Sequence, residues 1–324
     1  MKAIVYRRNG SPDVLEYEEI EKPVPGDKEV LVKVRAASIN PLDWRLMRGL
    51  PAVLRPLFGM GRPKLERAGV DVAGEVEAVG GKVTRFKPGD LVFGACKGAF
   101  AEYGCAAESR LALKPDNITF EQAASAVVAG VTALQALRDK GKLLPDQKVL
   151  INGASGGVGT FAIQIARSMG AHVTGVCSGR NLELVRSLGA DQVIDYTRED
   201  FTRMGARYDL ILDGVGSHSA ATLRRLLTSK GTCVMIGGPK GFRPMLRFLM
   251  TSVLGAIILS RMVSQTLLVF VARVDPEVLD SLGALMKAGR VVPVIDRVYA
   301  LSEVRDAMRY AEEGHVRGKV VLTA

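Results

Sequence analysis

The sequence predicts an α/β protein with a doubly wound parallel sheet and a second domain rich in β-strands. Short apolar strands alternate with helical segments after residue 117, which is typical of a parallel sheet covered on both faces. A glycine-rich turn joins one of these strands to a helix near residue 155. Before residue 117, alternating strand patterns are broken by Gly and Pro instead, which indicates a separate β-rich module.

The β-rich module contains the stretches "KAIVYR", "EVLVKVRAASIN" and "VAGEVEAVG", separated by turns such as "VPGD" and "KPGD". The end of the chain contributes helices, the stretch "VVPVIDRVYAL" and the strand "GKVVLTA", which we expect to return to this module. We therefore expect one domain from residues 1–117 with 273–324, and a second from residues 118–272.

The second domain opens with "TFEQAASAVVAGVTALQALRDKG", which has helical spacing and a capping box between Thr119 and Gln122. Crossover segments separate most of the strands that follow. These strands are "KVLING", "HVTGVC", "QVIDY", "YDLILDGVG", "TCVMIGG" and "TLLVFVA".

Composition and cysteine use point to the cytoplasm. The chain has 324 residues, 48% hydrophobic and 24% charged, as in an ordinary globular protein. Its N-terminus turns polar after one short run, unlike a secretory signal. The four cysteines form no C-x-x-C pair, which fits reduced thiols.

Two segments could suggest a nucleic-acid site or a membrane span, and the sequence argues against both. The net charge is +10, and basic residues crowd segment 45–67, but without the interleaved aromatics of a nucleic-acid site. We expect a solvated loop there, with attraction of a phosphate-bearing cofactor as the alternative. The apolar run 248–260 is too short to cross a bilayer. A buried or substrate-covering helix is the favoured reading, and a membrane-surface helix the less favoured one.

The glycine turn "NGASGGVG" predicts a dinucleotide site. Ala154, Gly156 and Gly159 match G-x-G-x-x-G, with Ala in the first place. Gly156 would let the backbone approach a pyrophosphate, and Gly159 would let the helix pack closely on the strand. The diphosphate would lie on the backbone amides at the start of the helix, among them those of Ser155, Gly157 and Val158.

The second strand of this unit ends without an acid, which predicts NADPH over NADH. An enzyme that prefers NADH usually places Asp or Glu there to accept hydrogen bonds from the ribose 2′-hydroxyl. Here Cys177 is followed by Ser178 and Arg180. A hydroxyl and a guanidinium would bind the 2′-phosphate that a carboxylate would repel.

These motifs, with "NPLDW", "GVDVAGEVEAVG", "AEY", "AGVTALQAL" and "RGKVVL", resemble the medium-chain dehydrogenase/reductase superfamily, most closely its zinc-independent quinone oxidoreductase branch. The resemblance covers nearly the whole chain. It implies a Rossmann doubly wound parallel sheet plus a GroES-like β-rich catalytic domain built from both ends of the chain. It also implies a homodimer, whose subunits would pair along the sheet edge "TLLVFVA".

The resemblance further implies roles for individual residues. Thr132 would meet the nicotinamide, and Tyr196 would close over the 2′-phosphate. Asn40 and Asp43 would lie at the substrate cleft, so that Asn40, Asp43 and Thr132 are the candidate catalytic residues. The remaining cofactor residues would be Gly214, Val215 and Gly216 on the adenosine side, and Gly237, Gly238 and Phe270 beside the nicotinamide.

Some alternatives stay open for these residues. The Thr132 hydroxyl could bond only to its own helix backbone. Tyr196 could have a plain packing role, and Asp43 could only fix the turn after Pro41.

No metal site is expected. In the zinc-dependent alcohol dehydrogenases of this superfamily, a Cys and a His bind the metal, but the matching stretches 36–40 and 69–71 contain neither residue. Zinc takes about four N or S ligands, and His172, His218 and His315 are scattered along the chain.

The sequence thus predicts an NADPH-dependent, metal-free oxidoreductase that passes hydride to a quinone or an α,β-unsaturated carbonyl. An enoyl-thioester or alkenal reductase of lipid metabolism is one alternative. A non-catalytic NADPH-binding redox sensor or membrane-peripheral protein is another.

Overall fold

The computed structural model describes residues 1–49, 66–238, 251–252, 255 and 264–324. The chain divides into two compact units. The first comprises residues 1–131, 274–289 and 293–324, and the second comprises residues 132–273 and 290–292.

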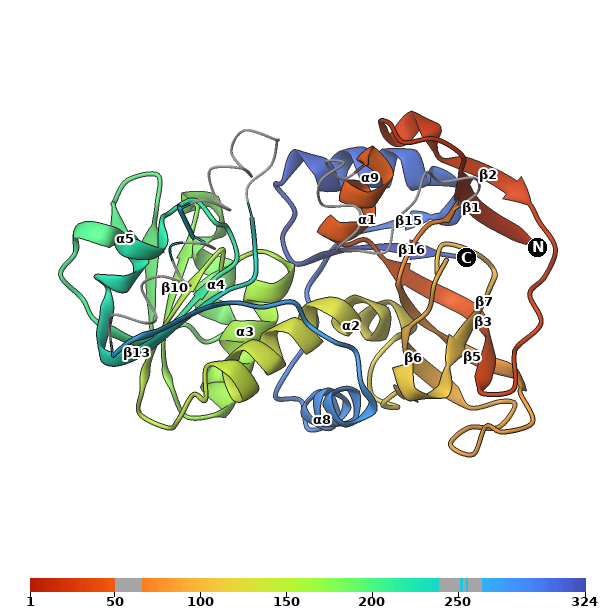
Figure 1. The fold of residues 1–324 in the computed structure, drawn as a ribbon, viewed down its shortest axis with the longest axis horizontal. Coiled ribbons are helices and arrows are strands. Elements are labelled where there is room, and N and C mark those ends of the chain that lie inside the picture. The colour runs from red at the N-terminus through yellow and green to blue at the C-terminus, as the bar shows by residue number, and fades with distance from the viewer. Residues whose placement is uncertain (50–65, 239–250, 253–254, 256–263) are drawn as a thin grey trace. The chain divides into compact units, whose positions relative to one another are not determined.

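The first unit is built on two sheets (Figure 1). The smaller has the order β2-β1-β4, and the larger has the order β15-β16-β3-β5-β6-β8, with β7 also paired to β3. The strands are β1 (Lys2–Tyr6), β2 (Glu16–Glu19), β3 (Glu29–Ser38), β4 (Glu66–Arg67), β5 (Asp71–Val79), β6 (Leu91–Ala95), β7 (Tyr103–Ala107), β8 (Leu111–Leu113), β15 (Ile295–Ala300) and β16 (Lys319–Thr323).

The end of the chain joins the sheet formed near its start. β16 pairs antiparallel with β3, with Val321 opposite Ser38 and Thr323 opposite Ala36. β3 pairs on its other side with β5, where Ser38 stands opposite Asp71. The return of the tail to the first module, expected from its strand pattern, is therefore observed.

The second unit has one sheet of six parallel strands in the order β11-β10-β9-β12-β13-β14. The chain order reverses between β9 and β12, as at the switch point of a Rossmann fold, where ligands bind beside the carboxyl ends of the strands. The strands are β9 (Lys148–Asn152), β10 (His172–Cys177), β11 (Gln192–Asp195), β12 (Tyr208–Asp213), β13 (Leu227–Met235) and β14 (Thr266–Val269).

Helices of the described residues pack on these sheets. Helix α2 begins with the expected capping box, in which Gln122 N–H donates to Thr119 Oγ1 and Thr119 N–H donates to Gln122 Oε1. The longer elements are α1 (Pro41–Arg48), α2 (Phe120–Leu134), α3 (Gly157–Ser168), α8 (Pro276–Lys287) and α9 (Val304–Glu313), and the shorter ones are α4 (Leu182–Ser187) and α5 (Ala220–Arg224). A π-helical segment, η4 (Gln135–Lys140), extends α2, and 3₁₀ turns include η5 (Gly179–Asn181).

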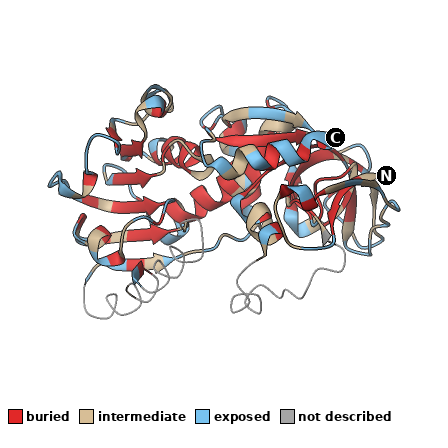
Figure 2. Cartoon of the chain, turned by 90° about the horizontal axis from the view of Figure 1, so that it is seen from above, coloured by how far each residue is buried: buried red, intermediate tan, exposed pale blue. Residues whose placement is uncertain are grey.

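Each unit has its own apolar core. Figure 2 shows buried residues along the strands and on the helix faces turned toward them, with exposed residues in the connections. The core of the first unit includes Phe100, Val32 and Leu322, and that of the second includes Leu150 and Ile211.

The structure corrects two expectations about local structure. The last strand of the parallel sheet ends at Val269 rather than Ala272, so the edge is shorter than expected. Within the basic segment 45–67, Arg45 and Arg48 lie on α1 rather than in a loop, because Asn40 and Asp43 cap a helix there.

Residues 50–65 of the basic segment lie outside the described residues, as does most of the apolar run 248–260. Among the described helices, none combines the length and apolarity required to span a bilayer.

Candidate functional site

The glycine turn between β9 and α3 has the geometry of a dinucleotide cradle. Gly153 has a φ of +86°, and the N–H of Ala154 donates to Val176 O at 3.0 Å. A Cβ on Gly159 would lie 2.2 Å from Gly153 O, so only glycine lets α3 pack this close to the turn. A Cβ on Gly156 would have no protein atom nearer than 3.4 Å, and this open side of the turn is where a bound diphosphate needs room.

The fold brings the other predicted cofactor residues to the same edge of the parallel sheet. Each follows the carboxyl end of a strand, and such ends share one edge. Ser178 follows β10, Tyr196 follows β11, Gly214 follows β12, Gly237 follows β13 and Phe270 follows β14. These positions and the glycine turn fit a dinucleotide laid across the strand ends.

Contacts between neighbouring loops hold this edge together. A Cβ on Gly237 would lie 2.0 Å from Gly214 O, so these two predicted glycines are in close contact. Phe270 N–H donates to Met235 O at 3.0 Å, which continues the pairing of β14 with β13. Val215, Gly216 and Gly238 lie in the same loops, and Val215 is 41% exposed.

Tyr196 is 59% exposed, so its side chain is not part of the packed core. Its backbone N–H donates to Cys177 O at 3.1 Å, which places Tyr196 beside the end of β10.

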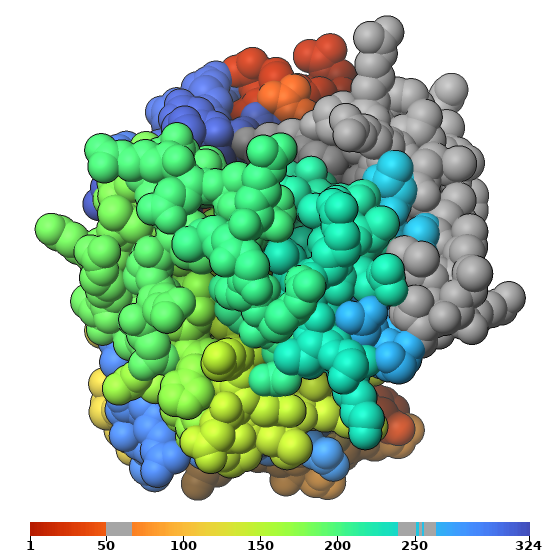
Figure 3. All heavy atoms as spheres, turned by 90° about the vertical axis from the view of Figure 1, so that its left-hand side faces the viewer, coloured from red at the N-terminus to blue at the C-terminus, as the bar shows by residue number. Residues whose placement is uncertain are grey.

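Figure 3 shows one face of the second unit, much of which is covered by the green and teal segments, the colours of α4 and α5. A surface hollow of about 570 Å³ in this unit contains none of the predicted site residues, and Arg203, Arg207 and Arg225 are among those that line it.

A buried asparagine that the sequence reasoning missed connects the glycine turn to the end of β10. Asn181 is 4% exposed, and its Nδ2 donates to Ser155 Oγ at 2.9 Å and to Ser178 Oγ at 3.2 Å. Both serine hydroxyls thereby accept, which leaves their own hydrogens available to donate to a phosphate. Asn181 Oδ1 has no hydrogen-bond partner among the described residues.

A second buried acceptor lies at the end of β12. Asp213 Oδ1 accepts from Asn152 Nδ2 at 2.8 Å and from the backbone N–H groups of Val215 and Gly216. Asp213 Oδ2 has no partner among the described residues although the side chain is fully buried. Unpaired buried acceptors are rare in native proteins, so two of them beside one sheet edge suggest a ligand that donates there.

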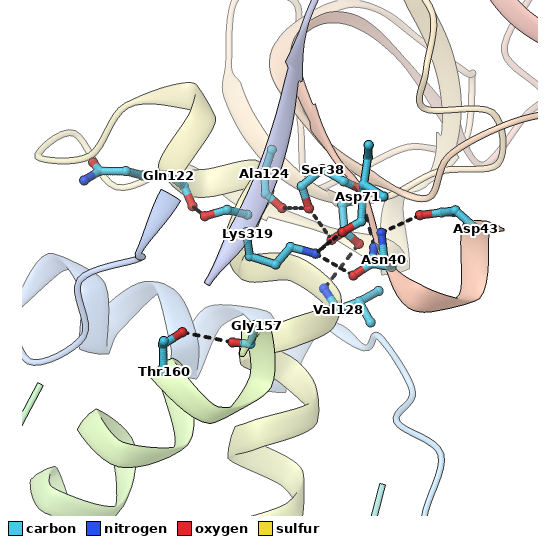
Figure 4. Close-up of polar contacts among 12 residues, drawn as sticks. Ser38, Asn40, Asp43, Asp71, Gln122, Ala124, Val128, Gly157, Thr160 and Lys319 are labelled. Atoms are coloured by element: carbon cyan, nitrogen blue, oxygen red, sulfur yellow. Dashed lines mark hydrogen bonds and ion pairs between the residues drawn. The ribbon is translucent and has the colours of Figure 1, made fainter. Parts of the chain in front are cut away.

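In the first unit, a buried polar cluster surrounds the predicted residue Asn40 (Figure 4). Lys319 Nζ donates to Asn40 Oδ1 at 2.6 Å and to Ile39 O at 2.8 Å, and lies 3.6 Å from Asp71 Oδ2. Ser38 Oγ donates to Asp71 Oδ2 at 2.7 Å. Burial raises the pKa of Asp71 and lowers the pKa of Lys319, while the attraction between the two opposes both shifts.

Asp43 belongs to the same region and caps α1. Its Oδ2 accepts from the Asn40 N–H at 2.7 Å, which completes a capping box. Burial raises the pKa of Asp43 to about 7. This geometry supports the alternative in which Asp43 fixes the turn after Pro41.

The three candidate catalytic residues do not form one constellation within either unit. Asn40 and Asp43 are buried in the first unit, whereas Thr132 is 8% exposed on α2 and belongs to the second. Asn40 is only 4% exposed, and its Nδ2 has a long contact of 3.5 Å to Ser38 O.

A zinc ion does not fit the residues that the structure describes. No group of three His, Cys, Asp or Glu side chains lies together among them. The polar cluster of the first unit instead contains an ammonium group, which repels a metal cation and takes the oxygens that would bind one. Among the histidines, His218 packs edge-on against Phe201 with ring centroids 5.0 Å apart.

Family models match both parts of the chain. An alcohol dehydrogenase GroES-like domain matches residues 26–116, and a zinc-binding dehydrogenase domain matches residues 188–322. The chloroplastic quinone oxidoreductase of Triphysaria versicolor is 34% identical over 99% of this chain and 98% of its own. A chloroplastic NADPH-dependent alkenal/one oxidoreductase of Arabidopsis thaliana is 34% identical over 99% of this chain and 79% of its own.

Solved structures of quinone oxidoreductases are also similar to this chain over its whole length. The quinone oxidoreductase of Coxiella burnetii superposes with a TM-score of 0.86 at 31% identity, covering 100% of this chain and 99% of that one. The Escherichia coli quinone oxidoreductase complexed with NADPH superposes with a TM-score of 0.82 at 26% identity, covering both chains fully.

These comparisons correct the expected cytoplasmic location. The relatives from Triphysaria versicolor and Spinacia oleracea are named chloroplastic, and an NAD(P)H oxidoreductase of Bos taurus is named mitochondrial. The sequence argument rested on unpaired cysteines and a polar N-terminus. Both bear on secretion and do not distinguish one reducing compartment from another.

Proposed function

Because the chain belongs to the quinone oxidoreductase branch of the medium-chain dehydrogenase/reductase superfamily, we propose that it is an NADPH-dependent reductase of quinones and α,β-unsaturated carbonyls. The observation that carries the proposal is the edge of the parallel sheet, where the glycine turn and the carboxyl ends of five strands come together. Residues 118–272 would bind the cofactor, and residues 1–117 with 273–324 would form the catalytic domain.

The preference for NADPH is supported by the residues after β10. Ser155 and Ser178 present hydroxyl donors organised by Asn181, and Arg180 and Tyr196 follow β10 and β11. No carboxylate ends β10 to accept from a ribose hydroxyl. An Arg and two hydroxyls suit a phosphate dianion better than a neutral ribose.

When bound, the reduced nicotinamide supplies the hydride. The chain's own residues bind and orient the reactants. The amides that open α3 hold the diphosphate, and the contact between Gly214 and Gly237 fixes the loops that border the dinucleotide. Thr132 would face the nicotinamide, and Asn40 would lie beside the acceptor.

We propose that the reaction needs no zinc, since the acceptor carbonyl is already polarised and the described residues offer no zinc ligand set. We also propose a homodimer, which the position of β14 at the edge of the sheet supports. The similarity to the alkenal/one oxidoreductase from Arabidopsis thaliana favours enones as a second acceptor class beside quinones.

The test is the loss of NADPH absorbance with purified, chelator-treated protein and a panel of quinones, enones and enoyl thioesters. Turnover of a quinone or an enone that survives chelation, and that is faster with NADPH than with NADH, is the expected result. Activity abolished by the chelator would contradict zinc independence. Turnover restricted to enoyl thioesters would favour the lipid-metabolism alternative.

A further inference from the structure

The buried lysine of β16 contacts three oxygens, two from the residues that follow β3 and one from the first residue of β5. Lys319 is 3% exposed, and its ammonium meets Ile39 O, Asn40 Oδ1 and Asp71 Oδ2 (Figure 4). Two of these contacts are hydrogen bonds, to Ile39 O and Asn40 Oδ1, and Asp71 Oδ2 lies at an ion-pair distance of 3.6 Å. Burying a charge is costly, and replacing a buried ion pair by apolar residues is often neutral. Stability alone therefore gives little reason for this arrangement.

Lys319 determines which way the side-chain amide of Asn40 faces. The oxygen and nitrogen of an amide have nearly the same shape, so the hydrogen-bond partner decides the orientation. Lysine can only donate, and the amide atom 2.6 Å from Nζ must therefore be the oxygen. The NH₂ group of Asn40 is then the end of the amide that contacts Ser38 O and the Asp71 carboxylate.

Lys319 also pairs with the carboxylate that contacts helix α2. Asp71 Oδ1 accepts from the N–H of Val128 at 3.2 Å, and Ser38 Oγ lies 3.2 Å from Ala124 O. Ala124 and Val128 are one helical turn apart on α2, and Thr132 follows by one further turn. The same ammonium is thus linked to Asn40 directly and to the turn of α2 before Thr132 through Asp71.

We propose that Lys319 is a positioning residue of the reductase, whose ammonium orients Asn40 and holds Asp71 against α2. This inference rests on the proposed function. The ammonium of Lys319 supplies the positive charge of this cluster, which also explains why the cluster does not suit a zinc ion.

The test compares Lys319→Met with a matched lysine outside the cluster. Lys114 is also largely buried, at 9% exposed, and its ammonium donates to Pro115 O and Ile118 O. We expect Lys319→Met to lower kcat for quinone or enone at least about tenfold, since small misplacements of reacting groups have effects of this size or larger. The Kd for NADPH, measured by fluorescence, should stay within about twofold. Lys114→Met should lower Tm without lowering kcat.

The double variant Asp71→Asn with Lys319→Met separates positioning from simple ion pairing, and it carries the test if the single variant does not fold. Removing both charges should restore much of the Tm, whereas kcat should stay low because Asn40 has lost its donor. Recovery of wild-type kcat in the double variant, or an unchanged kcat in Lys319→Met, would overturn the inference. A wild-type protein that reduces no acceptor would contradict the proposed function itself, and the inference would fall with it.

Discussion

The backbone N–H of Asn40 donates to the Asp43 carboxylate at 2.7 Å, and so closes the first turn of α1. The acid in this bond is buried, and its pKa of about 7 lies far above the value of 3.8 for an exposed aspartate. One residue expected at the substrate cleft is therefore engaged in local structure and titrates near neutrality.

Asp43 should make stability depend on pH. The folded state keeps a proton that the unfolded chain loses above pH ~4, so this contribution is full below that pH and is lost as the pH rises toward 7. Asp43→Asn should remove a difference of up to about 4 kcal/mol between the two ends of this range. Urea unfolding of both proteins at several pH values measures it.

In the Asp43→Asn variant, the new side-chain amide oxygen can still accept from the Asn40 N–H, so the cap should persist. Other carboxylates titrate in both proteins and cancel in the comparison. Parallel stability curves for the two proteins would show that Asp43 has the same pKa in the folded and unfolded states, which would contradict the prediction.

Arg180→Ala should weaken NADPH selectively. Loss of a charge-assisted hydrogen bond to the 2′-phosphate should raise the Kd for NADPH about tenfold or more. The Kd for NADH should barely change, because NADH has no phosphate there. Isothermal titration with both cofactors measures the ratio, and equal losses for the two would count against a phosphate contact.

Asn181→Asp should shift the preference toward NADH. A carboxylate would draw the hydroxyl hydrogens of Ser155 and Ser178 inward and would repel a 2′-phosphate, yet it could accept from a ribose hydroxyl. We expect the Kd for NADPH to rise about tenfold and the Kd for NADH to fall or hold. Asn117→Asp, at a site in the first unit where the amide donates to Met286 O, is the matched control.

Gly156→Ala and Gly159→Ala should affect different properties: the first should weaken NADPH binding, and the second should lower stability. A Cβ on Gly159 would lie 2.2 Å from Gly153 O, so this change should cost about 1–3 kcal/mol even without ligand. A Cβ on Gly156 meets nothing nearer than 3.4 Å, so the free protein should keep its stability while NADPH binding weakens. Unfolding and binding measured on both variants test this, and a destabilised Gly156→Ala protein would contradict it.

The fold was largely predictable because the periodicity of strands and helices reports burial directly. That the glycine turn and the strand ends would meet at one edge of the sheet was also predictable, since a parallel sheet brings all its carboxyl ends together. The roles of individual site residues remain predictions that the binding and turnover experiments test.

The polar cluster of Asn40, Asp71 and Lys319 could not be predicted from the periodicity of strands and helices. Lys319 opens the apolar strand "KVVLT", and Asp71 opens β5, so each was visible only as one charge beside an apolar run. Their meeting depends on β3 pairing with both strands, which is a long-range contact. Asn181 carries no signal of its own in the sequence, because only the fold of η5 turns its side chain back toward Ser155.

The pairing of β16 with β3 has a consequence for synthesis on the ribosome. The second unit is almost wholly continuous in sequence and can fold while the chain is still growing. The first unit must wait, because the strand that completes its larger sheet is the last to emerge. Until then Asp71 has no Lys319 beside it, and the Ala36–Ser38 part of β3 lacks the strand that pairs with it. A nascent chain stalled before residue 319 therefore exposes both an unpaired acid and an open strand, features that chaperones and proteases encounter in unfinished proteins.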